Sequence, residues 1–197
     1  MARKTAAEAA LTRQAIVDEA RKAFAANGYA ASSTTEIAQG ASVSRGALYH
    51  HFIDKAALFE AVFTDLCAEC DATVMQAAGG AGDARTAVDR GARAALEFAC
   101  RADYRQIALT DAIAVLGLER WHELDAAHGL SSMQLGLELL AGAGQLAAPP
   151  TLATTHALFG ALTQLSMSCG RGELTVDDAA AAFAVLLDAL RPAHVLG

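Results

Sequence analysis

The amino-acid sequence predicts an all-α protein with about nine helices. Hydrophobic residues make up 54% of its 197 residues and charged residues 19%, so the chain can bury a substantial core. Strong helix formers such as alanine and leucine are abundant, and only three prolines interrupt them. No segment alternates apolar and polar residues in the way that predicts a half-buried strand. The length fits one domain, or a small module joined to a larger one.

The first helix is expected to begin at Thr12, which can act as an N-cap, and to end at the Asn-Gly pair 27–28. Ile16, Ala20 and Phe24 recur every four residues and predict one buried stripe on an amphipathic helix. That stripe is the surface on which the following short helices are expected to pack.

Two short helices follow, separated by a turn. Thr34 or Thr35 can cap the first of them, and Glu36 in its first turn suits the positive end of the helix dipole. Segment 39–44, "QGASVS", holds a glycine and two serines and predicts the turn. The serine that ends this segment can cap a third helix, expected over 44–51. A supporting helix, a second helix, a tight turn and a short helix form the arrangement of a helix-turn-helix DNA reader.

The remainder of the chain is predicted to be a series of longer helices. Asp54 can cap a fourth helix over 54–76, and "AAGGAGDA" at 77–84 favours a break after it. The breaks between the later helices are rich in turn formers. These later helices are expected at about 84–101, 103–114, 118–143, 150–170 and 176–191.

The charge is divided unevenly between the two parts of the chain. The formal net charge is -7 at pH 7. Residues 1–55 hold seven basic and five acidic residues, a net charge of +2, whereas the rest holds eight basic and 17 acidic residues, a net charge of -9. This asymmetry indicates a head that approaches a polyanion and a body that does not.

The third helix is expected to turn a polar face outward. Leu48 and Phe52 are four residues apart and share a face, which predicts that they point inward, with Val43, against the first helix. His50 then points away from the core, and Gly46 leaves room for a close approach. Such a face suits a helix lying in a groove of DNA, where polar groups bond bases and phosphates. An ordinary solvated face remains the alternative.

Metal binding and catalysis are less well supported by this stretch. Adjacent residues of a helix diverge in direction, so His50 and His51 are poorly placed to chelate one metal, for which i and i+4 spacing is typical. No serine, cysteine or carboxylate is evidently placed as a nucleophile or orienting partner. We therefore expect neither an enzyme nor a bound cofactor or metal.

A pattern of identities at fixed spacing extends across the first four helices. Its positions are Ile16, Ala20, Phe24, Gly28, Tyr29, Ser33, Thr34, Ile37, Ala38, Ala41, Val43, Ser44, Gly46, Leu48, Tyr49, His51, Phe52, Lys55 and Leu58. With these residues, segment 12–62 resembles the N-terminal DNA-binding domain of the tetracycline-repressor (TetR) family of bacterial transcription regulators. Ser42 departs from the pattern, because the family usually has glycine there, and we expect a slightly altered turn. His50 lies at a position that varies in the family.

The resemblance implies a helix-turn-helix DNA-binding domain over 1–55 and a helical ligand-binding and dimerisation domain over 56–197. It also implies that Thr34 and Thr35 hold a phosphate, that Arg45 reaches base edges, and that Lys55 clamps the DNA backbone. The full set of implied DNA contacts is Thr34, Thr35, Ser44, Arg45, Gly46, Ala47, Tyr49, His50, His51 and Lys55.

The resemblance implies a ligand-responsive regulator, most simply a repressor, that binds a palindromic operator in double-stranded DNA as a homodimer and is released by a small-molecule effector. The last two helices, about 151–170 and 176–191, are expected to form the dimer because they are apolar around most of their circumference. A buried helix pair within one chain is the alternative. Candidate effector-pocket residues are Phe63, Cys100, Tyr104, Trp121, His122, Met133, His156, Gln164 and Met167.

Two alternative functions stay open. Cys67 and Cys70 form a Cys-x-x-Cys within a helix, which would suit a metal- or redox-responsive regulator on the same scaffold, although small buried cysteines also explain them. The other alternative is a helical small-molecule-binding protein or enzyme with a head that does not function. The chain shows no apolar run long enough for a bilayer span and no leader pattern, so we expect a cytoplasmic protein without a membrane partner.

Overall fold

The computed structural model describes residues 6–192, and this part of the chain is helical with no strand. It confirms the all-α prediction. The elements α6, η1 and α7 follow one another without a break, so the described residues hold nine helices. The chain forms two compact units: one comprises the chain up to Leu66 and Ala102–Trp121, and the other comprises Cys67–Arg101 and the chain from His122 onward. The functional division between residues 55 and 56 stays a prediction.

The first unit is built on α1 (Ala6–Ala31), against which α2 (Thr34–Gly40) and α3 (Arg45–His51) pack. Its core consists of large side chains from all of these helices and from the first turns of α4 (Lys55–Ala78). The predicted stripe of α1 is buried, as are the two inward residues of α3. The buried core residues named in the sequence pattern are Ile16, Ala20, Phe24, Ile37, Leu48, Phe52 and Leu58.

The start of α1 differs from the prediction. The helix begins at Ala6, and Thr12 lies inside it, where its hydroxyl donates a 2.8 Å hydrogen bond to the Glu8 carbonyl. Thr12 is therefore not an N-cap, because the alanine-rich segment before it continues the helix. The predicted break at the other end is real: Gly28 has φ 74° and ψ 167°, a conformation that is essentially restricted to glycine.

Hydroxyl and carboxylate caps begin the next three helices. The prediction for α2 was wrong by one or two positions: its N-cap is Ser33, whose Oγ accepts from the backbone N–H of Thr35 and of Glu36. The prediction for α3 is confirmed, since Ser44 Oγ accepts from Ala47 N at 3.1 Å. Asp54 Oδ1 accepts from the backbone N–H of the third residue after it at 2.7 Å and begins α4 as expected.

A helix with a π-helical centre completes the first unit. It consists of α6 (Ala102–Tyr104), η1 (Arg105–Asp111) and α7 (Ala112–Leu116). Asp111 Oδ2 accepts a 2.7 Å hydrogen bond from the backbone N–H of Tyr29, and Arg21 forms a 2.6 Å ion pair with Asp103. These two contacts tie this helix to α1.

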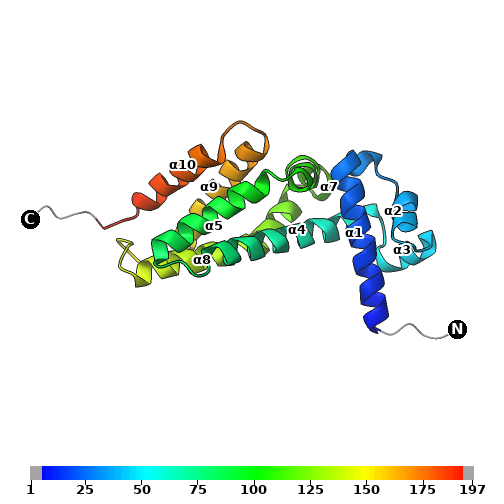
Figure 1. The fold of residues 1–197 in the computed structure, drawn as a ribbon, viewed down its shortest axis with the longest axis horizontal. Helices are drawn as coiled ribbons and strands as arrows, with labels where there is room; N and C mark the ends of the chain where they lie inside the picture. Colours follow the sequence, from blue (N-terminus) through cyan, green and yellow to red (C-terminus); the bar gives the residue numbers. More distant parts are fainter. Residues whose placement is uncertain (1–5, 193–197) are drawn as a thin grey trace, which may run out of the picture. The chain divides into compact units, whose positions relative to one another are not determined.

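The second unit is a helical bundle. In it, α5 (Ala84–Ala99), α9 (Leu152–Gly170) and α10 (Val176–Asp188) lie side by side (Figure 1). The C-terminal half of α8 (Leu118–Gly142) contributes to the same core. The buried residues of this core are Ala92, Leu137, Leu140, Leu158, Phe183 and Leu187.

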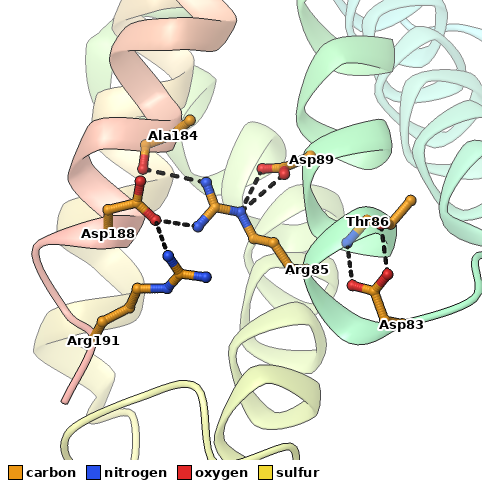
Figure 2. A network of polar contacts seen from close by, with 7 residues as sticks. All are labelled: Asp83, Arg85, Thr86, Asp89, Ala184, Asp188 and Arg191. Atoms are coloured by element: carbon orange, nitrogen blue, oxygen red, sulfur yellow. Dashed lines mark hydrogen bonds and ion pairs between the residues drawn. The ribbon is translucent and has the colours of Figure 1, made fainter. Parts of the chain in front are cut away.

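A polar network ties the first turn of α5 to the last turn of α10 (Figure 2). Arg85 Nε lies 2.9 Å from both carboxylate oxygens of Asp89 on its own helix. The guanidinium also forms an ion pair with Asp188 and donates to the Ala184 carbonyl at 3.4 Å. The Arg85 side chain is 18% exposed, but those of Asp89 and Asp188 are 45% and 48% exposed, so solvent still screens these ion pairs.

Candidate nucleic-acid interface

The inner face of α3 is fixed by packing and by its ends. Leu48 is fully buried and Phe52 nearly so, and the Arg13 guanidinium of α1 lies 5.0 Å from the centre of the Phe52 ring. The Val43 backbone N–H donates to the Ala38 carbonyl at 2.9 Å and closes the turn before the helix. With its inner face and N-terminus fixed, α3 presents a single defined face to solvent.

That outer face carries the polar residues expected from the sequence. Arg45, Tyr49 and His50 are exposed, and the Arg45 guanidinium lies 5.5 Å from the centre of the Tyr49 ring. His51 is partly buried, and its ring meets the His50 ring edge-on at 5.6 Å between centroids. A cation, a phenol and the His50 imidazole are therefore exposed along one surface, where they can donate hydrogen bonds to an external acceptor, and the His51 ring lies beside them.

At Gly46 and Ala47, the outer face of α3 carries no side chain larger than a methyl group. Gly46 is exposed, and a Cβ added to it would meet only the Ser44 Oγ, at 3.8 Å. Packing within the chain therefore does not require a glycine here. A partner that approaches α3 from outside could come close to the backbone at this position.

The N-terminal turn of α2 borders this face. Thr34 Oγ1 lies 3.2 Å from the Tyr49 hydroxyl, within hydrogen-bonding distance, and Thr35 is exposed beside it. The pKa of Tyr49 is lowered, first by its hydrogen bond with Thr34 and next by Arg45. The hydroxyls of α2 and the outer face of α3 thus form one continuous polar surface, which also includes Ser44.

Lys55, in the first turn of α4, is held by the end of α1. Its Nζ lies 4.4 Å from the centre of the Tyr29 ring and donates to the Ala30 carbonyl at 3.4 Å. Both contacts orient the ammonium group without neutralising its charge, because neither partner is an anion. The cation is therefore available to an external phosphate.

Ser42 adopts a strained backbone conformation in the turn between α2 and α3. Its φ is 56°, in the left-handed region that glycine adopts freely, and its backbone N–H donates to the Gln39 carbonyl at 2.9 Å. The turn is retained although the family's usual glycine is absent.

The nine residues expected to line an effector pocket do not share one unit. Phe63, Tyr104 and Trp121 belong to the first unit, and the other six to the second. His156 and Gln164 are exposed on α9, whereas Met133 packs against the core of the second unit. The remaining three are Cys100 and His122, which are exposed, and Met167, which is partly buried. Their placement gives no support to a shared pocket, which stays a prediction.

Asp125 of α8 was missed by the sequence reasoning. Its Oδ2 atom is buried, and no hydrogen-bond donor among residues 6–192 contacts it. Burial raises its pKa to about 6, against the opposing effects of nearby His122 and a hydrogen bond from Thr163 of α9. Asp125 lies one helical turn after the buried Trp121, but the sequence alone does not show that α9 packs against this carboxyl.

The two cysteines of the Cys-x-x-Cys lie inside the second unit, one turn apart on α4. Burial raises the pKa of the Cys67 thiol, and it raises that of Cys70 to about 12. Both groups are therefore protonated at neutral pH, and the thiolate is the form that reacts or binds a metal. Within the described part of the chain, no three His, Cys, Asp or Glu side chains come together in a way that could hold a metal ion.

Models of known families match both parts of the chain. The model described as bacterial regulatory proteins of the tetR family matches residues 16–62. The model described as the tetracyclin repressor-like C-terminal domain matches residues 86–191, more than half of the chain. The chain belongs to the TetR family of bacterial transcriptional regulators. This confirms the resemblance seen in the sequence and extends it to the second unit.

Curated relatives match this TetR-family chain in its N-terminal part. The HTH-type transcriptional regulator AcrR of Shigella flexneri is 49% identical over 63 residues, which cover 32% of this chain and 29% of the relative. The HTH-type transcriptional repressor BepR of Brucella suis is 48% identical over 60 residues, covering 30% and 29%. The chain thus spans less than a third of the length of these relatives. They are named as regulators, not enzymes.

Solved structures match this TetR-family chain over nearly its whole length. A TetR-family transcriptional regulator from Pectobacterium atrosepticum is 32% identical, with a TM-score of 0.81, and the match covers 95% of this chain and 98% of that one. A regulator from Mesorhizobium loti, 20% identical with a TM-score of 0.74 over 95% and 97%, shows the same fold. None of the helices between residues 6 and 192 is both long and apolar enough to span a bilayer.

Proposed function

We propose that this TetR-family regulator is a repressor that binds a palindromic operator as a homodimer and releases it when a small-molecule effector binds. Repression is supported by relatives such as BepR, whose name describes a repressor. The observation that carries the proposal is the outer face of α3, where an exposed arginine, tyrosine and histidine surround a glycine that internal packing does not require.

The exposed groups suggest a division of work on DNA. Arg45 is the group that reads a base, because a guanidinium can bond a guanine edge in two places. Gly46 and Ala47 set how closely α3 enters the major groove. Lys55, held by the Tyr29 ring and a carbonyl oxygen, binds phosphate as a point charge.

Other hydroxyl and imidazole groups complete the proposed contact surface. Thr34 and Thr35, at the start of α2, bond a phosphate together with the Tyr49 hydroxyl, which already lies 3.2 Å from Thr34 Oγ1. His51 bonds a second phosphate, and the exposed His50 a base or a phosphate. Ser44 keeps its role as the cap of α3 and lies at the edge of the surface.

Two alanine variants test this division. Arg45→Ala should weaken operator binding by about 1–3 kcal/mol and relax base preference at one position of each half-site. Lys55→Ala should weaken binding to every duplex alike and make the affinity less dependent on salt, because one phosphate contact is lost. Fluorescence anisotropy of labelled duplexes at several salt concentrations measures both effects.

A matched control removes a lysine outside the proposed surface. Lys22→Ala changes the net charge by the same amount, and Lys22 is exposed on α1, where it pairs with Glu19 at 2.9 Å. Its operator affinity should stay close to that of the wild type. If Arg45→Ala or Lys55→Ala binds operator as well as this control does, the role given to that residue is wrong.

The proposed dimer uses the outer faces of α9 and α10. Both helices bury one side in their own unit through residues such as Leu158 and Phe183, yet they also expose apolar groups. Leu152 is 67% exposed and Val185 66% exposed. A second copy that covers these faces would remove the apolar surface from water, which a symmetric dimer can do with one patch.

For an effector to release DNA, its binding in the second unit has to change the position of the DNA-binding helices. The helix of Ala102–Leu116 belongs to the same compact unit as the head and is tied to α1 at Asp103 and Asp111. Both α4 and α8 run from one unit into the other. An effector that prefers one arrangement of these helices would shift the spacing of the two heads, and only this difference in affinity can drive release.

A further inference from the structure

A carboxyl that is only partly hydrogen-bonded distinguishes the second unit from an ordinary helical core. Two buried side-chain atoms in the described part of the chain lack a hydrogen-bond partner, Asp125 Oδ2 and Gln145 Oε1. Of the two, only Asp125 can be ionised, and although Thr163 bonds this carboxyl, an oxygen of a buried carboxylate without a donor is more costly than an amide oxygen. An ordered water or a ligand from outside the chain can supply the missing donor.

The helices around Asp125 meet closely. On α8, Asp125 and Gly129 are one turn apart, and on α9, Thr163 and Phe159 are one turn apart. Thr163 bonds the Asp125 carboxyl, and a Cβ added to Gly129 would lie 2.5 Å from Phe159 Cε2. The carboxyl therefore lies one helical turn from an aromatic ring that packs directly on α8.

The charges near Asp125 leave a negative excess. Cys70 of α4 is influenced by the carboxylates of Asp125, Asp71 and Glu69. Arg101 neutralises Glu69 through a 2.5 Å ion pair, and Asp71 accepts a hydrogen bond from the neutral Ser132 hydroxyl. His122 is the basic group that acts on Asp125, and it is exposed. An external donor at Asp125 is therefore favoured if it carries a positive charge.

We propose that Asp125 anchors the effector of this regulator, and that the effector is a protonated amine on an aromatic body. The amine donates to Oδ2, Thr163 supports the carboxyl from α9, and the aromatic body lies toward Phe159. The effector role rests on the ligand-responsive function proposed above. Binding of the amine to Asp125 can be measured without DNA.

Isothermal titration calorimetry on the full chain at pH 7.5 tests the anchor. The probes are 1-naphthylmethylamine and its neutral counterpart 1-naphthalenemethanol, which share the aromatic body. The wild type should bind the amine at least ~10-fold more tightly than the alcohol, the gain expected for one charge-assisted hydrogen bond. Asp125→Asn should lose this preference.

Asp71→Asn is the matched control, because it removes a neighbouring carboxylate that already has a partner within the chain. It should keep most of the preference for the amine. Circular dichroism of each variant establishes that it is folded. The proposal is overturned if the wild type binds neither probe, if it does not prefer the amine, or if Asp125→Asn keeps the preference.

A second arm separates this inference from the proposed function. The amine is added to a complex of the protein with operator DNA, and anisotropy follows release. Amine binding that depends on Asp125 but releases no DNA would leave the anchor in place and refute effector-driven release. Release by the amine that is unchanged in Asp125→Asn would support release and refute the anchor.

Discussion

Replacing Asp125 by asparagine removes a buried charge from the second unit while nearly preserving the shape of the side chain. Burial raises the pKa of this carboxyl from its usual 3.8 to about 6 in the folded protein. The folded state therefore binds a proton that the unfolded state releases, and the wild type loses stability as pH rises between these two values. The loss is nearly complete about one pH unit above the folded pKa, and it should not occur in Asp125→Asn.

The size of the effect follows from the two pKa values. A difference of about two units, at 1.36 kcal/mol each, corresponds to a penalty of about 3 kcal/mol in the wild type at pH 8. About half of this penalty is already present at pH 5, because an unfolded carboxyl is mostly ionised there. The stability advantage of Asp125→Asn should therefore grow by about 1.4 kcal/mol between pH 5 and pH 8.

Urea denaturation followed by far-ultraviolet circular dichroism measures this advantage. Both proteins are compared at pH 5 and pH 8 and at one protein concentration, because the stability of a dimer depends on concentration. Other titrating groups are common to both proteins and largely cancel in the difference. The reasoning is refuted if the difference in unfolding free energy is the same at both pH values, or if Asp125→Asn is the less stable protein at pH 8.

Other substitutions test the turn, the polar network and the proposed dimer. Ser42→Gly should raise the unfolding free energy by about 1 kcal/mol, because glycine has no Cβ to clash with the backbone at the left-handed φ of 56°. An unchanged urea midpoint would contradict this. Arg85→Met should lower it by about 1–2 kcal/mol, since the links to Asp89 and Asp188 are lost; no loss in the same assay would mean that the network contributes nothing. Val185→Glu should convert the dimer to monomers in sedimentation velocity, because a charge is buried at the proposed interface. A dimer of unchanged stability would place the interface elsewhere.

Much of the fold was predictable because local signals agreed with the tertiary structure. Ser44 and Asp54 cap helices in the structure as they were predicted to, and Gly28 ends the regular part of α1. Where several residues offered the same chemistry, the sequence left the choice open. Four hydroxyl residues in a row, at 32–35, span the start of α2, and the structure uses Ser33 as the cap rather than Thr34 or Thr35.

Features that depend on neighbours distant in the sequence were not predictable in this way. Asp125 looks like an ordinary helix acid until α9 is packed against it, because its burial depends on residues such as Thr163 that lie far along the chain. The pocket candidates were chosen for residue type alone, and residue type does not distinguish the exposed His156 from the half-buried Met167. The face of α3 was predictable because its inner residues are local and strongly apolar.

Sequence-specific DNA binding is the central claim, and a titration by fluorescence anisotropy tests it most directly. The purified protein is titrated into labelled DNA from upstream of its own gene and into a scrambled duplex of the same length, both at physiological salt. We predict tight binding to the first duplex alone, with two protein chains per site. Equal, weak binding to both duplexes would mean that only nonspecific electrostatic attraction is present, and it would contradict the role given to α3.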